Sequence, residues 1–492
     1  MSNQLSDGFI IVCKRDCPTC TLVEPVMATL SAGSTPLLVY TQDDPTFPES
    51  LAANYSEILV DDTELAVSYG LDIDTVPTLI KMVHGEEVAR TVGWNQAAWR
   101  DITGIGDLGE GLPLHRPGCG SLNVMPGMAE RLAARFGDTN LHARRVVVNV
   151  FDDPVEICYD RGWSDGLPLV PPTEERVIRM LTGTTRSPDE IVGIVPPNQT
   201  ECTVEKVAIN AVMAGCKPEY MPVVLAAVEA ALVDEFCMHG VLATTYFSGP
   251  VVIVNGPIAR AIGMNSEGNV FGQGNRANAT IGRALQLVIR NVGGGRPQEI
   301  DRSAQGNPGK YTFCFAENEQ GSPWESLAVT RGFSPDVSTV TLFAGGGVHG
   351  MIDQMSRTPE SLVRSFAACL RTVGHPKLAM GADAILAVSP EHGNVFRAAG
   401  WSKQRVLDEI HANSQLRGDD IVRGAGGIDE GIPADRVQDV MSKFRPGGLM
   451  IVYVGGTAGL FSSIIGGWPG SGPRGSQPVT VEVNSEQLIV NS

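Results

Sequence analysis

The chain has 492 residues, of which 43% are hydrophobic and 19% are charged, and its formal net charge is −18 at pH 7. One hydrophobic core rarely extends over such a length, so we expect two or three domains. The negative charge argues against nucleic acid or an anionic membrane surface as the main partner, because both attract a basic face. Ten cysteines in this length are too few for a disulfide scaffold.

The start of the chain is polar, without the basic and apolar regions of a signal peptide. The longest apolar runs are interrupted by Gly, Pro or charge before the roughly 20 residues that a membrane helix needs. We therefore expect a soluble, cytoplasmic protein whose thiols are free unless they are catalytic. A homo-oligomer is expected on general grounds only.

The first predicted strand, the apolar run 9–12, is followed by Cys17-Pro-Thr-Cys20 and a predicted helix over 21–30. A C-x-x-C at a strand-to-helix junction is typical of a redox site in a reducing compartment. Cys17 would be the attacking thiol, because a helix N-terminus favours the thiolate. Cys20, one turn later, would resolve the mixed disulfide. The pattern predicts a redox-active disulfide between Cys17 and Cys20.

A second predicted strand over 36–40, a helix over 64–70 and the segment Val76-Pro77-Thr78 complete the first unit. The combination of C-x-x-C and Val-Pro-Thr resembles the thioredoxin fold over residues 1–105. The resemblance implies that Pro77 is cis, faces the thiols and binds an extended substrate backbone beside its preceding carbonyl.

Three features depart from ordinary thioredoxin: a Pro-Thr dipeptide between the two cysteines, no Trp before Cys17, and a third cysteine, Cys13. A docking module without redox activity is therefore an alternative. Metal binding by these three thiols is another, although no fourth ligand follows nearby.

Residues 106–145 are rich in Gly and Pro and are predicted to be a linker. Cys119 lies in it between two glycines, and His115 and Arg116 are the neighbours that would hold a thiolate. Cys119 is the best single-cysteine nucleophile candidate in the chain. The alternative is a turn that merely contains a cysteine.

Residues 146–492 are predicted to form a large α/β region with a possible subdomain break near 300–335. Apolar runs bounded by Gly, Pro or polar residues predict strands, and longer apolar segments with capping residues predict helices. The expected strands cover 144–150, 250–256, 310–316, 338–344, 384–389 and 449–454, and the expected helices cover 174–181, 204–214, 221–233 and 280–290.

Ligands of α/β sheets bind outside the carboxyl ends of the strands. Residues that follow predicted strands are therefore candidates: Glu317, Glu319 and His349 for substrate binding, and His392 as a catalytic base. Glu391 precedes His392, but adjacent loop residues rarely face each other, so a carboxylate elsewhere would orient the imidazole. A structural histidine is the alternative for each.

A Gly- and Asn-rich stretch over 263–278 lies between a predicted strand and a helix, with Asn275 and Arg276 at its end. Such a loop at a helix N-terminus is a plausible anion-binding site, although it matches neither the P-loop nor the dinucleotide fingerprint. Ordinary turns are the alternative.

Cys216, Cys237 and His239 have the chemistry of metal ligands, but their spacing matches no standard zinc pattern. The alternative is that the two thiols are core residues, since free cysteine is among the most buried residue types.

The runs 162–177, 211–220 and 315–319, with Pro323-Trp324, resemble an uncharacterised bacterial family associated with UGSC-type selenoproteins, over residues 150–475. That resemblance transfers no catalytic assignment. Cys119-Gly-Ser-Leu122 resembles the selenocysteine-Gly-Ser-Cys motif, with Cys in the selenocysteine place and Leu in the last. It implies that Cys119 is a reactive thiol that lacks its own resolving partner, which Cys17 and Cys20 would then supply.

Together these patterns predict a thiol-dependent oxidoreductase or lyase. A C-x-x-C pair would serve a larger α/β region that acts on a small polar metabolite by reductive cleavage or sulfur transfer. A thiol reductant system would be its partner. Two alternatives stay open: a metal-dependent lyase or hydrolase with a docking domain, and a non-enzymatic thiol or metal carrier.

Overall fold

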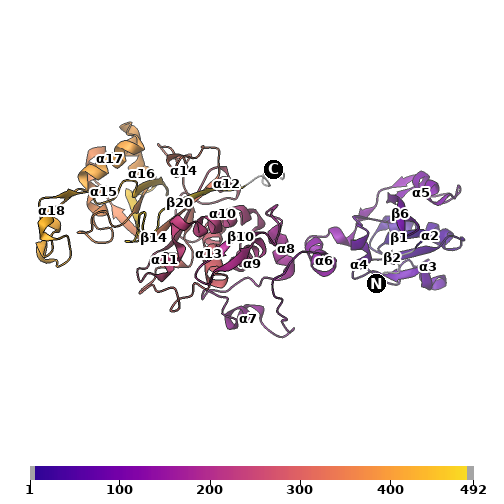
Figure 1. Cartoon of the computed structure of the whole chain (residues 1–492). Coiled ribbons are helices and arrows are strands. Elements are labelled where there is room, and N and C mark those ends of the chain that lie inside the picture. The colour runs from indigo at the N-terminus through magenta and orange to yellow at the C-terminus, as the bar shows by residue number, and fades with distance from the viewer. Residues whose placement is uncertain (1–5, 485–492) are drawn as a thin grey trace. The chain divides into compact units, whose positions relative to one another are not determined.

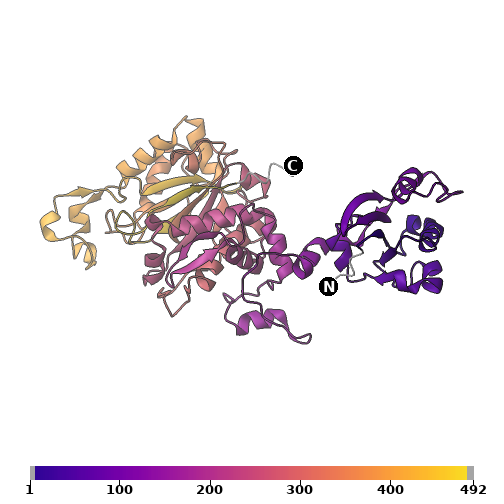
Figure 2. The same ribbon diagram turned by 45° about the vertical axis from the view of Figure 1, so that its right-hand side comes forward.

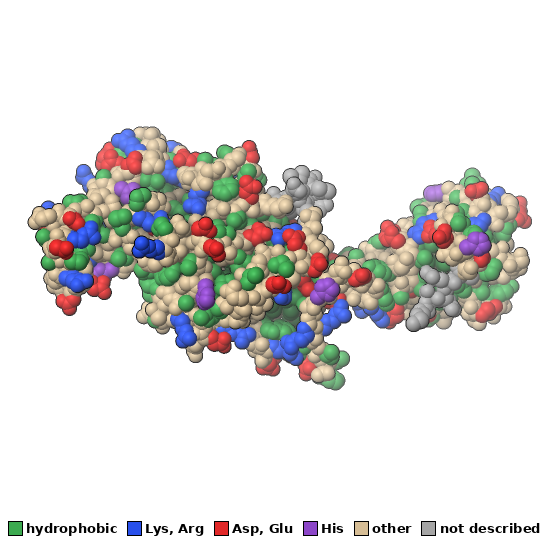
Figure 3. Space-filling view, in the orientation of Figure 1, with side chains coloured by type: hydrophobic (Ala, Val, Ile, Leu, Met, Phe, Trp, Pro, Cys, Tyr) green, Lys and Arg blue, Asp and Glu red, His purple; other side chains and the backbone are tan. Residues whose placement is uncertain are grey.

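The computed structural model describes residues 6–484 and divides into two compact units, Met1–Thr139 (unit 1) and Asn140–Ser492 (unit 2). Both combine helices with sheets, which confirms the predicted multidomain α/β fold (Figure 1). On the face drawn in Figure 3, acidic and basic side chains are interspersed. Within the described residues, no helix is both long enough and apolar enough to cross a membrane.

Unit 1 is built on a five-stranded sheet in the order β3-β2-β1-β5-β6. The central strand β1 is buried along its whole length because its sequence, GFIIVC, is almost entirely apolar. It pairs parallel with β2 and antiparallel with β5. The bounds are β1 (Gly8–Cys13), β2 (Leu37–Thr41), β3 (Leu59–Asp61), β5 (Thr78–Val83), β6 (Glu86–Val92), α1 (Pro18–Leu22), α2 (Glu24–Ser31), α3 (Glu49–Asn54), η1 (Ser56–Ile58), α4 (Ala66–Gly70) and α5 (Gln96–Thr103).

The segment predicted to be a linker is instead largely a folded part of unit 1, and the division falls after Thr139. It forms two short antiparallel pairings, β7 (Trp94–Asn95) with β8 (His115–Arg116), and β4 (Thr75–Val76) with β9 (Cys119–Gly120). The 3-10 helix η2 (Leu122–Val124) and α6 (Met128–Phe136) follow. Gly109 and Gly118 of this segment permit close approach, to the Trp94 ring and to the Val76 carbonyl, whereas Gly106 and Gly111 lie in open space.

Unit 2 contains a seven-stranded sheet in the order β13-β12-β14-β19-β15-β18, with β20 also paired to β14. One sheet therefore spans the predicted subdomain break. Only β12–β13 and β15–β18 pair in parallel, so the sheet is mixed. The strands are β12 (Gly249–Asn255), β13 (Cys314–Ala316), β14 (Thr339–Ile352), β15 (Ala384–Val388), β18 (Leu449–Tyr453), β19 (Phe461–Gly467) and β20 (Val479–Glu482).

Strand β14 joins the two halves of this sheet, and its register shifts between Gly345 and Val348. Its first half pairs with β12 and β20, and its second half pairs with β19. The two ends of the sheet also meet, because the backbone N–H of Asn318, after β13, donates to the carbonyl of Tyr453 in β18 at 2.8 Å. Polar residues from distant strands are thereby brought together.

Helices cover the two halves of the sheet separately (Figures 1 and 2). Helices α9 (Val204–Ala214), α10 (Met221–Leu232) and α13 (Arg276–Asn291) share a core with β12, β14 and β20. Helices α15 (Pro359–Leu370), α16 (Pro390–Ala398) and α17 (Lys403–Asn413) share another with β15, β18 and β19. The opposite strand faces form a third apolar cluster of Val251, Ile253, Phe315, Phe343, Ile385, Met450 and neighbours.

The strand predicted over 144–150 is absent, although the strands and helices expected elsewhere in unit 2 are present with shifted ends. Val147 is 89% exposed and Phe151 99% exposed, so β-branched composition alone does not form a strand without a pairing partner. The remaining elements are α7 (Pro154–Asp160), α8 (Glu174–Leu181), β10 (Ile191–Val195), β11 (Thr200–Thr203), η3 (Pro218–Tyr220), η4 (Asp234–Phe236), α11 (Met238–Ala243), α12 (Pro257–Ala261), η5 (Pro308–Lys310), α14 (Leu327–Thr330), β16 (Leu416–Arg417), α18 (Gly418–Ile421), η6 (Ala425–Gly427), η7 (Ala434–Arg436) and β17 (Val440–Met441).

Candidate functional site: a three-thiol cluster in unit 1

Three cysteines of unit 1, Cys17, Cys20 and Cys119, form one hydrogen-bonded group, which we call the thiol cluster. Cys17 is the N-cap of α1, with extended backbone, and Pro18 occupies the first turn of the helix. The Cys17 Sγ accepts the backbone N–H of Cys20 at 3.3 Å. The end of β1 thus places Cys17, the predicted attacking thiol, at a helix N-terminus.

The Val76–Pro77 peptide bond is cis, and the Cys17 Sγ lies 3.5 Å from the Val76 carbonyl oxygen. This is the geometry implied by the sequence resemblance, in which the residue before the proline faces the thiols. Pro77 therefore lies at the candidate site.

Cys119 reaches the same place through β9, where its Cα lies opposite that of Val76 in the antiparallel pairing. Its thiol hydrogen-bonds to Cys17. Residues 115–121, which we call the strap, are fastened by side chains that sequence reasoning missed. The Thr19 hydroxyl donates to the Pro117 carbonyl at 2.7 Å, and the Lys14 Nζ donates to the Gly120 carbonyl at 2.8 Å.

Hydrogen bonding gives the three sulfurs different roles: Cys17 accepts as a thiolate, and the thiols of Cys20 and Cys119 donate to it. Those from the Cys20 thiol, the Cys119 thiol and nearby backbone N–H groups lower the pKa of Cys17 to about 5, against the opposing effect of burial. Burial and the neighbouring Cys17 raise the pKa values of Cys20 and Cys119. At neutral pH the cluster therefore holds a thiolate at Cys17.

The three sulfurs differ in access to solvent. Cys17 is 1% exposed and Cys20 is 0% exposed, whereas Cys119 is partly exposed. His115 and Arg116, the predicted thiolate-holding neighbours, are exposed in β8, opposite β7. Burial and the neighbouring Cys17 raise the pKa of Cys119, and Lys14 is the cation that opposes this rise without outweighing it. Cys13 is fully buried, and burial raises its pKa well above the ordinary value.

A second polar cluster, which we call the carboxylate cluster, joins Glu317 and Glu319 to Asn255 in unit 2. The Asn255 Nδ2 donates to both carboxylates, at 2.7 Å and 2.8 Å. Glu317 also accepts the backbone N–H of Leu327 at 2.7 Å and of Tyr453 at 3.3 Å. Both glutamates follow a strand, β13, as the sequence predicts, and their role in substrate binding stays a prediction. Burial raises the pKa of Glu317.

Lys403, at the start of α17, faces this carboxylate cluster and was not identified from the sequence. The side chain is 3% exposed, and its Nζ finds no hydrogen-bond partner among residues 6–484. Burial lowers the pKa of Lys403, and attraction to Glu317 partly opposes that effect. The Gly-Trp-Ser-Lys sequence at the start of α17 carries no signal for a buried amine.

The two candidate histidines do not hydrogen-bond to the carboxylate cluster. His349 is exposed on β14, opposite Ile464. His392 is completely buried; its Nδ1 lies 2.8 Å from the Ser462 hydroxyl and its Nε2 lies 3.1 Å from the Asp353 carbonyl oxygen. Burial lowers the pKa of His392. Its ring is oriented by a serine and a backbone carbonyl, not by the carboxylate expected for a catalytic base.

The predicted anion-binding residues are engaged with backbone groups. The Asn275 side chain caps α13 by accepting the Asn278 N–H, and its Nδ2 donates to the Gly263 carbonyl at 2.8 Å. Arg276 donates to the carbonyls of Gly215 at 2.9 Å and Cys216 at 3.4 Å. Both side chains therefore brace the loop and the end of α9.

The metal-ligand candidates do not converge. Cys216 is buried and donates to the Thr280 carbonyl at 3.4 Å, and burial raises its pKa to about 12. Cys237 precedes α11 with a φ of 55°, and His239 lies within that helix. Over the described part of the chain, no group of three or more His, Cys, Asp or Glu side chains is placed to hold a metal ion.

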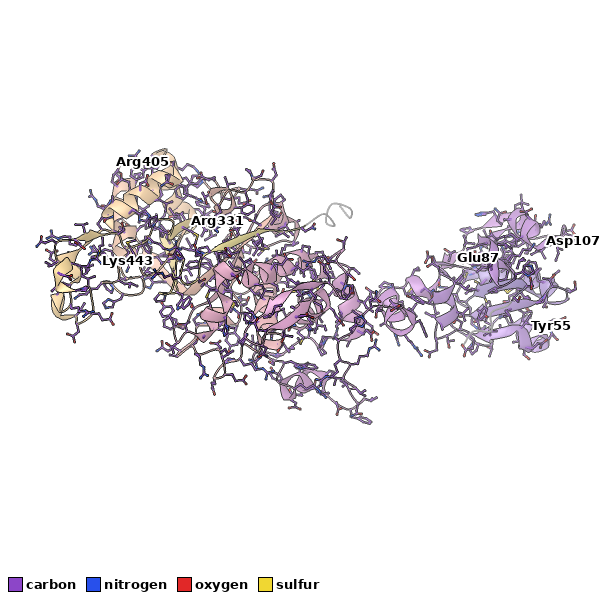
Figure 4. All side chains as sticks on the ribbon, viewed as in Figure 1. Tyr55, Glu87, Asp107, Arg331, Arg405 and Lys443 are labelled. Atoms are coloured by element: carbon purple, nitrogen blue, oxygen red, sulfur yellow. The ribbon has the colours of Figure 1, made fainter. Side chains whose placement is uncertain are left out.

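Two surface pockets lie away from these residues. One of about 340 Å³ is lined by Thr244, Tyr246, Phe247, Trp468 and neighbours. The other, of about 410 Å³, is lined by His375, Lys377 and Glu430 among others. Beside the second, Lys443 (labelled in Figure 4) donates to the carbonyls of Val373, His375 and Leu378, and burial lowers its pKa to about 8.

No protein-family model, curated protein or solved structure matches this chain. The resemblances inferred from motifs therefore stay predictions. The assignment of the thiol cluster as a candidate functional site therefore depends on its geometry alone.

Proposed function

We propose that unit 1 is a thioredoxin-like dithiol–disulfide oxidoreductase and that the whole chain is a thiol-dependent enzyme. The observation that supports this most strongly is the thiol cluster itself. It places an N-cap thiolate at Cys17 beside a buried resolving thiol, Cys20, and a second sulfur, Cys119. A docking module would have no need of a thiol whose pKa is lowered to about 5.

In the proposed reaction, the Cys17 thiolate attacks one sulfur of a substrate disulfide and releases the other sulfur as a thiolate. Cys20 then gives its proton to the thiolate released in the first step, attacks the Cys17 sulfur, closes the Cys17–Cys20 disulfide and releases the second substrate thiolate. The protein loses two electrons and the substrate gains them. An external dithiol reductant reduces the Cys17–Cys20 disulfide and completes the cycle.

Unit 2 would act on a small polar metabolite, by reductive cleavage or sulfur transfer. Support comes from the carboxylate cluster of Asn255, Glu317 and Glu319, with Lys403 nearby. An unpaired buried amine is costly, so its presence beside a carboxylate points to a role other than stability.

The test is a redox titration of the full chain in buffers of reduced and oxidised glutathione, read by peptide mapping under non-reducing conditions. We expect a Cys17–Cys20 disulfide in wild type and its loss in Cys17→Ser. Cys369→Ser, which removes a partly exposed thiol of unit 2, is the matched control and should titrate as wild type. Failure of Cys17–Cys20 to oxidise at any glutathione ratio would reject the proposed function.

A further inference from the structure

The strap occupies the backbone edge beside the thiols. Thr75 and Val76, the two residues before the cis-proline, pair antiparallel with Gly120 and Cys119. An exposed strand edge next to a thiolate would bind an extended polypeptide by strand addition. Here the main-chain groups of that edge are used by the same chain, and the residue opposite Val76 is a cysteine.

Two further contacts hold the strap close to this edge. A Cβ on Gly118 would lie 2.7 Å from the Val76 carbonyl oxygen and 2.4 Å from the Thr75 Cγ2, so only glycine permits this approach. The Ser121 hydroxyl accepts the Gln42 Nε2–H at 2.7 Å, and both side chains are buried. These contacts supplement those of Thr19 and Lys14.

As a consequence, the reactive thiolate is covered. Cys17 is buried under a segment whose own thiol, Cys119, is partly exposed and hydrogen-bonded to the Cys17 sulfur. A disulfide in solution therefore meets Cys119 first, while Cys17 meets only Cys20 and Cys119 until the strap moves.

From this we infer that Cys119 is the entry thiol of a three-cysteine relay and that the strap restricts the oxidoreductase to small disulfides, excluding extended polypeptides. The inference rests on the proposed function and names its substrate class. It assigns to the strap the position that a polypeptide substrate would otherwise occupy.

The relay has three exchange steps. Cys119 gives its proton to the Cys17 thiolate and attacks a small disulfide RSSR, forming Cys119–S–S–R and releasing RS⁻, which takes that proton from Cys17 and leaves as RSH. The Cys17 thiolate attacks the Cys119 sulfur, forming a Cys17–Cys119 disulfide and releasing the second RS⁻. Cys20 then attacks the Cys17 sulfur and gives its proton to the departing Cys119 thiolate, forming Cys17–Cys20 and restoring the Cys119 thiol. The Cys17 thiolate, the Cys20 thiol and RSSR thus yield one protein disulfide, one RSH and one RS⁻.

The first test traps the intermediate in the full chain. Cys20→Ser is treated with oxidised glutathione and mapped under non-reducing conditions; we expect an intramolecular Cys17–Cys119 disulfide. In Cys20→Ser/Cys119→Ser, which lacks the entry thiol, glutathione should attach to Cys17 much more slowly, because the strap still covers Cys17, and should then stay there. If Cys20→Ser alone keeps glutathione on Cys17 with Cys119 free, the relay is rejected. The proposed function would survive that result as long as wild type still forms Cys17–Cys20.

The second test opens the strap without changing a thiol. Gly118→Ala introduces the clash with Val76, whereas Gly120→Ala, two residues later, meets only the Val124 side chain at 3.5 Å. Ser121→Ala removes the contact with Gln42 and serves if Gly118→Ala is poorly folded. The probes are insulin, for polypeptide disulfides, and bis(2-hydroxyethyl) disulfide, for small ones.

We expect Gly118→Ala, or Ser121→Ala, to increase insulin reduction by about tenfold, the change expected from losing one or two docking hydrogen bonds. Gly120→Ala should behave as wild type. Equal insulin reduction by wild type and by folded Gly118→Ala and Ser121→Ala would overturn the gating role of the strap.

Discussion

The thiol cluster of unit 1 and the carboxylate cluster of unit 2 are both buried. The surroundings of the first favour a charged group, whereas those of the second favour neutral groups. In unit 1, hydrogen bonds lower the pKa of Cys17 and favour its thiolate form. In unit 2, burial raises the pKa of Glu317 and lowers that of Lys403, so it opposes charge on both. The difference separates a cluster whose hydrogen bonds favour the charged form of a group from one whose burial favours the neutral forms.

The two clusters also differ in what covers them. A short strap, fastened by a few hydrogen bonds, covers Cys17. Glu317 is enclosed by backbone from α14 and β18, within the framework of the large sheet. Opening the first requires a local movement, whereas opening the second requires disruption of the core.

The largest effect that this comparison predicts is a thiolate at Cys17 in the reduced protein at neutral pH. In the reduced protein, thiolate absorbance at 240 nm should titrate with a midpoint near pH 5 and disappear in Cys17→Ala. Cys20→Ala should raise the pKa of Cys17 more than Cys119→Ala does, because the Cys20 hydrogen bond has the larger effect. A midpoint near the ordinary thiol value of 9.0 would remove the distinction between the clusters.

Loss of Glu317 should be the largest stability effect in unit 2. Glu317→Ala leaves the donors Asn255, Leu327 and Tyr453 without their acceptor and should lower the free energy of unfolding by about 3 kcal/mol. Glu317→Gln keeps an acceptor oxygen and should cost much less. Urea-induced unfolding of unit 2 measures the free energy of unfolding of both variants. Equal losses would show that the charge of Glu317, not its hydrogen bonds, determines its contribution to stability.

Reduced wild type and Cys17→Ala should differ in melting temperature by a few degrees, and this difference should depend on pH. The folded-state pKa of Cys17 lies below the unfolded value, so its stabilisation is complete above about pH 9 and is lost as the pH falls through about 5. Thermal melts from pH 8 to 5 should therefore bring the two proteins progressively closer. A constant difference over that range would contradict the lowered pKa.

The smallest expected effect is a gain in the free energy of unfolding, not a loss. Lys403→Met removes a buried amine without a described hydrogen-bond partner and should stabilise unit 2 by about 1 kcal/mol. Exposed Lys217→Met at a surface position provides the control and should change the free energy of unfolding little. Clear destabilisation by Lys403→Met would indicate that the amine is paired with Glu317 as an ion pair.

The sequence by itself determined the local features of this protein. Cys17 and Cys20 at a strand-to-helix junction and the apolar strands of the large sheet depend on residues close together along the chain. Hydrophobic runs, caps and turns are short-range signals, so they can be interpreted without knowing the fold. The same local logic failed at 144–150, where a strand requires a partner that composition does not supply.

Only the tertiary structure decided which distant residues meet. Glycine and proline in the strap looked like a flexible linker, yet Gly118 permits the close approach that sets Cys119 beside Cys17. Glu317 and Tyr453 are 136 residues apart and meet because the ends of the large sheet come together. Such pairings depend on long-range packing, for which residue type and spacing carry no direct signal.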